Sequence, residues 1–233
     1  MKTKFLLIGF LSLFILSCSS DDNSGSDPQN PQSKKLIETI NLNGILIKYK
    51  FNNKLTVQSL DIGVTGSFLF NYSENRISSI EYADDVWEFL YDANGKIKSF
   101  TKGIEVVDVT YNAAENSYSY EKEEGKKTTL ILTENLDVKK YSILDTQTEE
   151  LLKYEYFYDN SKNGVLTNSN NIAVYLVMVT DYYDIGLYAS KKPAQTFSSN
   201  AIPFSFENTY YENGFVTKSI INGTNTIYYA YNQ

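Results

Sequence analysis

The chain has 233 residues, of which 42% are hydrophobic and 21% charged, and its formal net charge at neutral pH is −7. One cysteine and no histidine exclude a disulfide framework, a Cys/His zinc site and any catalytic arrangement that uses histidine as its base. The single arginine, Arg76, and the acidic balance argue against a protein that binds nucleic-acid phosphates. We therefore expect one globular domain, or two small ones, without a metal or cofactor.

The first residues have the pattern of a bacterial lipoprotein signal. Two lysines precede an apolar run over residues 5–16 that is too short to span a bilayer. The segment Ile15-Leu16-Ser17-Cys18 resembles a lipobox, in which the cysteine is acylated and becomes the first residue of the mature chain. The alternative is an ordinary signal peptide with an incidental cysteine. We predict a signal peptide over residues 1–17 and a lipid on Cys18 that anchors the protein to a membrane.

The segment after the cysteine has the composition of a flexible tether. Residues 19–35 contain no apolar side chain, so they cannot bury enough surface to fold. We predict a lipidated, disordered tether over residues 18–35. Its opening, Ser19, Ser20, Asp21 and Asp22, resembles the acidic export signal of Bacteroidetes surface lipoproteins, although linkers are often rich in Ser and Asp. That resemblance implies an outer-membrane location, with the protein exposed on the cell surface.

Residues 36–233 carry the signals of repeated β-hairpins. Apolar and polar residues alternate, and turns such as Asn94-Gly95 and Asn213-Gly214 separate the arms. An aromatic residue closes the first arm about every twenty residues, at Tyr72, Tyr91 and Tyr111 and later at Tyr158, Tyr211 and Tyr231. We predict an all-β fold, an antiparallel meander of about 12–14 strands that forms a curved sheet or an open barrel.

The segment YDANGKIKSF at residues 91–100 resembles the YD or RHS-type repeat. Residues 36–231 as a whole resemble a family of Bacteroidetes cell-surface lipoproteins built from such hairpins, a domain of unknown function. The stretch from Tyr158 to Gly164 is similar to the "YD…KNP" insertion of that family, but Gly164 stands where the family usually has proline. Membership would imply the fold and the lipoprotein status, and no activity.

An insertion at about residues 163–200 interrupts the repeat. Its apolar run, residues 172–179, could be helix or strand by periodicity, and the flanking residues favour a helix that caps one face of the sheet. Aromatic residues in a long loop can stack on sugars or anchor a protein, so we take Tyr182, Tyr183 and Tyr188 as a possible binding surface. The alternative is that they pack the insertion onto the sheet. Further aromatic residues lie in or beside the insertion, at Phe197, Phe204 and Phe206.

No residue pattern nominates catalysis. The acidic pairs Asp84-Asp85, Glu123-Glu124 and Glu149-Glu150 are adjacent, so on a strand their members would point to opposite faces. We therefore predict a non-enzymatic, surface-anchored binding domain whose partner is an unknown protein or glycan. One alternative is an immunity or inhibitor lipoprotein whose acidic surface neutralises a secreted toxin or enzyme. A second alternative is a glycan-binding surface lipoprotein.

Overall fold

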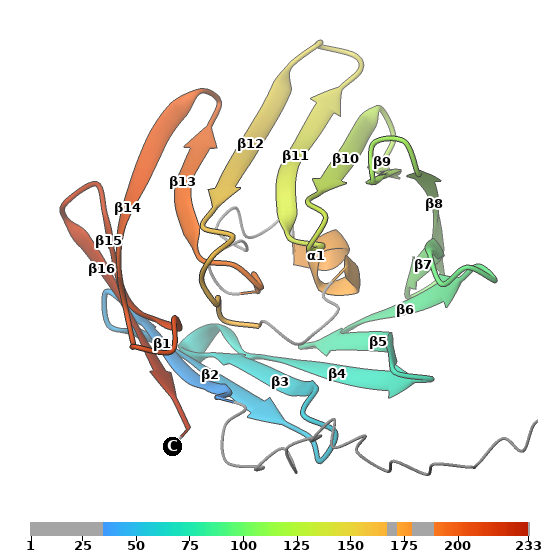
Figure 1. Cartoon of the computed structure of the whole chain (residues 1–233). Helices are drawn as coiled ribbons and strands as arrows, with labels where there is room; N and C mark the ends of the chain where they lie inside the picture. The colour runs from blue at the N-terminus through green and yellow to red at the C-terminus, as the bar shows by residue number, and fades with distance from the viewer. Residues whose placement is uncertain (1–34, 167–171, 179–188, 233) are drawn as a thin grey trace, which may run out of the picture. The chain divides into compact units, whose positions relative to one another are not determined.

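The computed structural model describes residues 35–166, 172–178 and 189–232. These residues form sixteen antiparallel strands that close into a barrel (Figure 1). The strands are β1 (Ile37–Leu42), β2 (Ile45–Phe51), β3 (Val57–Ile62), β4 (Ser67–Ser73), β5 (Arg76–Tyr82), β6 (Asp85–Tyr91), β7 (Ile97–Lys102), β8 (Glu105–Asn112), β9 (Ser117–Glu123), β10 (Lys126–Leu132), β11 (Val138–Asp145), β12 (Leu151–Tyr158), β13 (Ala194–Ser199), β14 (Ile202–Tyr210), β15 (Val216–Ile221) and β16 (Asn225–Tyr231). A 3-10 turn, η2 (Gly63–Thr65), follows β3, and a short helix, α1 (Ile172–Met178), lies between β12 and β13.

The barrel is a meander in which each strand pairs with the next, and it closes where the first strand meets the last. Ile40 of β1 lies opposite Tyr229 of β16. Beyond these strands, the Leu36 N–H donates to Asn232 Oδ1 at 2.8 Å, and the Asn232 N–H donates to the Leu36 carbonyl at 2.9 Å. The predicted all-β meander is therefore confirmed, with sixteen strands among the described residues and a closed barrel in place of a curved sheet or open barrel.

The twenty-residue repeat is visible in the strand register. A register shift precedes the aromatic that closes the first arm at Phe51, Tyr72, Tyr91, Tyr158 and Tyr210. The residue that closes β14 is therefore Tyr210, and Tyr211 already belongs to the turn. In the two Asn-Gly turns, Gly95 and Gly214 have φ values of +76° and +82°, as hairpin turns of this kind require.

The barrel lumen is the hydrophobic core. Inward-facing side chains such as Ile80, Phe100 and Leu130 are buried, whereas the residues between them point outward and are mostly polar. The outward set includes charged residues around the whole wall: Lys48, Asp61, Glu81, Glu88, Lys98, Asp108, Glu121, Lys140, Lys153, Glu155, Glu207 and Lys218. In barrels that span membranes the outer face is apolar, and a charged group there costs several kcal/mol near the midplane. The described outer wall is therefore not a lipid-facing surface.

In the described part of the chain, no helix has the length and apolar character needed to cross a membrane.

The insertion between β12 and β13 places α1 inside the barrel (Figure 1). The side chains of residues 172–177 are all buried, because the helix lies against the inner wall. The Tyr120 hydroxyl donates to the Leu176 carbonyl at 2.9 Å, and the Tyr175 hydroxyl donates to the Ala189 carbonyl at 2.9 Å. The expected helix is thus present, and it fills part of the lumen of a closed barrel instead of capping one face of a sheet.

Hydrogen bonds to a buried carboxylate hold the end of the insertion. Asp137, in the turn after β10, accepts the N–H groups of Lys191 and Lys192 at 2.6 and 3.1 Å. The Gly164 N–H donates to the Lys191 carbonyl at 2.8 Å, and a Cβ at Gly164 would lie 2.8 Å from backbone atoms of Lys191 and Lys192. The packing therefore requires glycine at this position.

The two ends of the barrel differ in their connections. The start of β1, the end of β16, the described part of the insertion and the turns after the even-numbered strands lie at one end, which we call the insertion end. Short turns after the odd-numbered strands form the opposite end, which we call the mouth.

Candidate functional site

Hydrogen bonds connect neighbouring hairpins along the part of the mouth formed by β9–β16. The Thr146 N–H donates to the Gly125 carbonyl at 2.7 Å. The Lys153 N–H donates to Asn200 Oδ1 at 2.8 Å, and the Asn222 side chain accepts the Ser205 N–H at the same distance. These contacts tie the turns after β9, β11, β13 and β15 to a neighbouring turn or strand, so the part of the mouth formed by β9–β16 is a connected rim that is held in place before a ligand binds.

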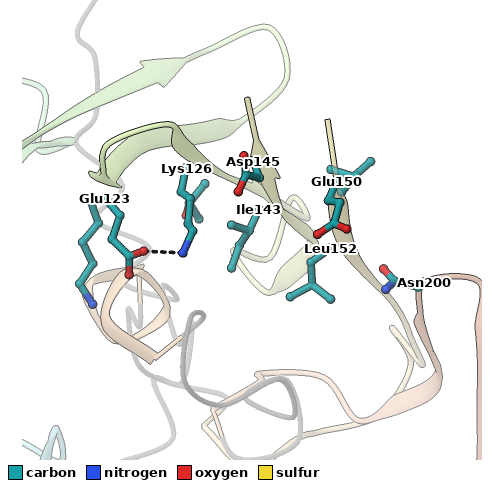
Figure 2. A pocket seen from close by; sticks show the side chains of 10 residues that line it. Glu123, Lys126, Ile143, Asp145, Glu150, Leu152 and Asn200 are labelled. Carbon is teal, nitrogen blue, oxygen red and sulfur yellow. Dashed lines mark hydrogen bonds and ion pairs between the residues drawn. The ribbon is translucent and has the colours of Figure 1, made fainter. Parts of the chain in front are cut away.

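The larger pocket of the mouth, about 630 Å³, lies between β9 and β12 (Figure 2). Thr128, Ile143 and Leu152 lie side by side on β10, β11 and β12 and form its floor, which is apolar at Ile143 and Leu152. Charged residues from the strand ends and turns line the entrance: Lys122, Glu123, Lys126, Asp145 and Glu150. A pocket of this size with an apolar floor and a few charged groups has the character of a ligand site.

Two carboxylates at this entrance are held in the ionised form. Glu123 pairs with Lys126 at 2.6 Å, and the hydrogen bond and charge of that lysine lower the pKa of Glu123. Asp145 Oδ1 accepts the N–H groups of Thr148 and Gln147 at 3.0 and 2.9 Å, which lowers the pKa of this carboxyl. Carboxylates with lowered pKa values act as fixed negative charges at neutral pH.

A second pocket of the mouth, about 220 Å³, is lined by six apolar or aromatic side chains, four of them aromatic, and by three polar ones. Phe197 packs on Phe204 with ring centroids 5.2 Å apart and on Tyr156 at 5.0 Å. The polar groups around it come from the turn after β15 and the start of β16: Asn222, Thr224 and Asn225. Aromatic rings with amide and hydroxyl groups beside them can bind a sugar or another compact ligand with one apolar face.

No metal centre emerges from the described residues, because no three acidic or cysteine side chains gather within reach of one ion.

Comparisons with known proteins leave the family open. No protein-family model and no curated protein matches the chain. Among the solved structures that match, a porin-like protein from Bacteroides uniformis ATCC 8492 is 11% identical, with a TM-score of 0.49. The match covers 85% of this chain and 97% of the other. The likeness is too distant to carry any property of that protein to this chain.

The residues that the sequence nominated fall into two groups. Cys18, the export residues Ser19 to Asp22, and Tyr182, Tyr183 and Tyr188 lie outside the described residues. The remaining aromatic candidates beside the insertion, Phe197, Phe204 and Phe206, come together in the smaller pocket.

Three acidic pairs, whose adjacent positions in the sequence argue against a catalytic role, lie at the mouth. Asp84-Asp85 connects β5 to β6, Glu123-Glu124 ends β9, and Glu149-Glu150 precedes β12. Counting hairpins from the first strand could have found this shared location, because alternate turns of a meander lie at the same end.

Proposed function

We propose that this protein is a lipoprotein, held on the outer membrane by a lipid on Cys18, that binds a partner at the mouth of its barrel without catalysis. The observation that carries the proposal is the asymmetry of the barrel. The described part of the insertion fills part of the lumen near one end, whereas the other end offers two pockets. A binding function accounts for this arrangement, because it keeps one end accessible on a rigid scaffold.

The charged outer wall supports a separate anchor. A barrel with this wall cannot attach by exposing its strands to lipid. Two or three acyl chains on Cys18 would supply lasting attachment, since each buried methylene contributes about 0.8 kcal/mol. The chain enters the barrel at Leu36, which is hydrogen-bonded to Asn232 at the insertion end. The tether would therefore pull on that end and leave the mouth directed away from the membrane.

Two carboxylates at the entrance of the larger pocket support binding over catalysis. Glu123 and Asp145 have lowered pKa values, whereas a general acid or base works best with a pKa near the working pH. Fixed charges suit recognition of a partner of opposite charge.

The experiment places a thiol at the mouth of the full chain in its natural host. Thr148→Cys adds an exposed thiol, and Cys18 itself would be blocked by its lipid. We expect a membrane-impermeant maleimide to label the variant on intact cells, and a fatty-acid analogue to label the wild type but not Cys18→Ala. When Asp21 and Asp22 are also changed to Ala, maleimide labelling should require lysed cells, whereas Asp27→Ala should change nothing. A wild type that takes up no fatty-acid analogue would end the lipoprotein proposal, and labelling of Thr148→Cys only after lysis would end surface display.

The aromatic pocket favours glycan binding as a second candidate function. Its rings could stack on a sugar face while Asn222 and Asn225 bond the hydroxyl groups. Glycan-array binding that is lost in Phe204→Ser and kept in Phe157→Ser, an exposed outer-wall control, would support this function. Equal loss in both variants would argue against it.

A further inference from the structure

The two ends of the barrel differ in charge. We compare, at each end, the turns and the two strand residues on either side of each turn, within the described chain. The mouth has four lysines, Lys102, Lys122, Lys126 and Lys127, against ten carboxylates: Asp61, Glu81, Asp84, Asp85, Glu105, Glu123, Glu124, Asp145, Glu149 and Glu150. The insertion end has eight carboxylates, Glu38, Glu74, Asp92, Glu115, Glu134, Asp137, Asp159 and Glu212, and ten cations: Lys35, Lys50, Lys54, Arg76, Lys96, Lys98, Lys139, Lys162, Lys191 and Lys192. The negative charge is therefore concentrated at the mouth.

The mouth also exposes aliphatic side chains. Six of its eight turns carry one at the turn or beside it: Ile45, Val64, Val86, Ile104, Leu151 and Ile202. Val64 and Ile104 are fully exposed, although valine and isoleucine are among the residues most often buried. At the insertion end, counted in the same way, the large apolar residues that are exposed at the described turns or within two strand residues of them are fewer: Leu55, Leu90, Phe157 and Tyr211. Exposed apolar groups within a charged rim are typical of an interaction surface.

We propose that the mouth docks a basic protein, one whose contact surface combines lysine or arginine with apolar side chains. This inference rests on the proposed binding function of the mouth and names the class of partner. Exposed aliphatic side chains lie at six of the eight turns of the mouth, and contacts spread over that area suit the extended surface of a protein. The excess of carboxylates selects a cationic surface and repels anionic lipid and nucleic acid.

The larger pocket suits one side chain of such a partner. Ile143 and Leu152 would contact the methylene groups of a lysine or arginine, and Glu150 at the entrance would face its charged head. The Glu123–Lys126 pair stays at the side of the entrance and is already satisfied. The connected rim keeps these groups in place before the partner arrives.

The test measures binding of synthetic peptides to the lipidated full chain, purified in a non-ionic detergent. One peptide alternates lysine with leucine, a second replaces lysine by glutamate, and a third replaces leucine by serine. We expect the lysine–leucine peptide to bind with an affinity that falls as salt is added, and the lysine–serine peptide to bind at least tenfold more weakly. We expect no binding of the glutamate–leucine peptide. Binding of the glutamate–leucine peptide as tight as that of the lysine–leucine peptide would overturn the proposal.

Matched variants locate the contact on the molecule. The triple change Asp84→Asn, Glu105→Gln and Glu149→Gln should weaken binding of the lysine–leucine peptide about tenfold. The control triple at the insertion end, Glu74→Gln, Glu134→Gln and Glu212→Gln, should leave it unchanged. The pair Val64→Ser and Ile104→Ser should weaken binding of this peptide at least tenfold. The control pair on the outer wall, Leu90→Ser and Phe157→Ser, should leave binding unchanged.

Three outcomes would overturn the proposal. Equal losses in the mouth variants and their controls would place the peptide elsewhere. Self-association of the protein without any peptide, abolished by the mouth variants, would make a second copy of the chain the occupant. Saccharide binding lost in Phe204→Ser, with no peptide binding, would keep the mouth as the binding site and exclude the basic protein as its partner.

Discussion

Asp137 shows how one side chain secures the insertion. It is fully buried, and its two oxygens accept the N–H groups of Lys191 and Lys192. Burial raises the pKa of Asp137 from 3.8 to about 6, although these N–H groups and the nearby lysine charges act in the opposite direction. The same carboxylate raises the pKa of the partly buried Tyr158, on which the loss of solvent has the larger effect. Both carboxylate oxygens therefore have hydrogen-bond donors, but burying the ionised carboxylate still costs free energy of folding.

We predict that this cost appears in the pH dependence of unfolding. Because the folded-state pKa is raised, the contribution of Asp137 to stability is fully present below about pH 4 and is lost as the pH rises through about 6. Relative to Asp137→Asn, which does not titrate, the wild-type free energy of unfolding should fall by at most about 3 kcal/mol between about pH 4 and pH 7. Urea unfolding at several pH values measures this. Glu134→Gln, exposed in the same turn, is the control, and parallel profiles for wild type and Asp137→Asn would contradict the prediction.

At the scale of the element, a tyrosine links each of several hairpins to the preceding one. The hydroxyls of Tyr72 and Tyr91 donate to the carbonyls of Val57 and Ile77 at 2.7 and 2.6 Å. Tyr158 donates to the Val138 carbonyl at 2.8 Å. Each acceptor lies near the start of the second strand of the preceding hairpin, so the repeat includes a hydrogen bond between hairpins. Burial raises the pKa of Tyr72 and of Tyr91 to about 12, which keeps both hydroxyls protonated as donors.

We predict that removing one of these hydroxyls destabilises the barrel. Tyr72→Phe and Tyr158→Phe should each lower the free energy of unfolding by about 1 kcal/mol, since the ring stays packed while the carbonyl loses its donor. Tyr228→Phe is the matched control, because this ring is exposed on the outer wall. Equal stability of all three variants and the wild type would show that these hydrogen bonds contribute nothing measurable.

The helix of the insertion depends on its surroundings. With seven residues, α1 is too short to be stable alone in water. It carries apolar side chains on every side, a pattern that fits a helix enclosed by other elements. The barrel wall therefore stabilises the helix, and the helix in turn fills lumen that would otherwise be empty.

For the whole molecule, the charged wall and the apolar lumen predict folding without lipid. We expect the mature chain without residues 1–18 to refold from urea into a β-rich monomer in buffer without detergent. Circular dichroism and sedimentation measure this. Refolding that requires detergent micelles would contradict the assignment of the outer wall to water.

The repeat, the turn glycines and the presence of a helix could be predicted from sequence because each depends on neighbouring residues. Gly95 follows from a hairpin turn, and the apolar run at residues 172–179 indicates a buried segment. Of the predicted closing aromatics, Tyr72, Tyr91 and Tyr158 follow a register shift, and Tyr111 lies near the end of β8 without one. At the end of β14 the closing residue is Tyr210 and not the predicted Tyr211. There, two tyrosines are adjacent, and the register alone distinguishes them.

The sequence by itself thus determined the local elements and, through alternation, which residues share a face of the sheet. Only the tertiary structure decided that the sheet closes, which end the insertion fills, and where the carboxylates and exposed aliphatic residues gather. Closure depends on contacts such as that between Leu36 and Asn232, which are 196 residues apart. A period of two is the same in an open sheet and in a closed barrel, so no local pattern distinguishes them. The mouth becomes a site for the same reason, because its residues are distant along the chain and meet only when the first strand pairs with the last.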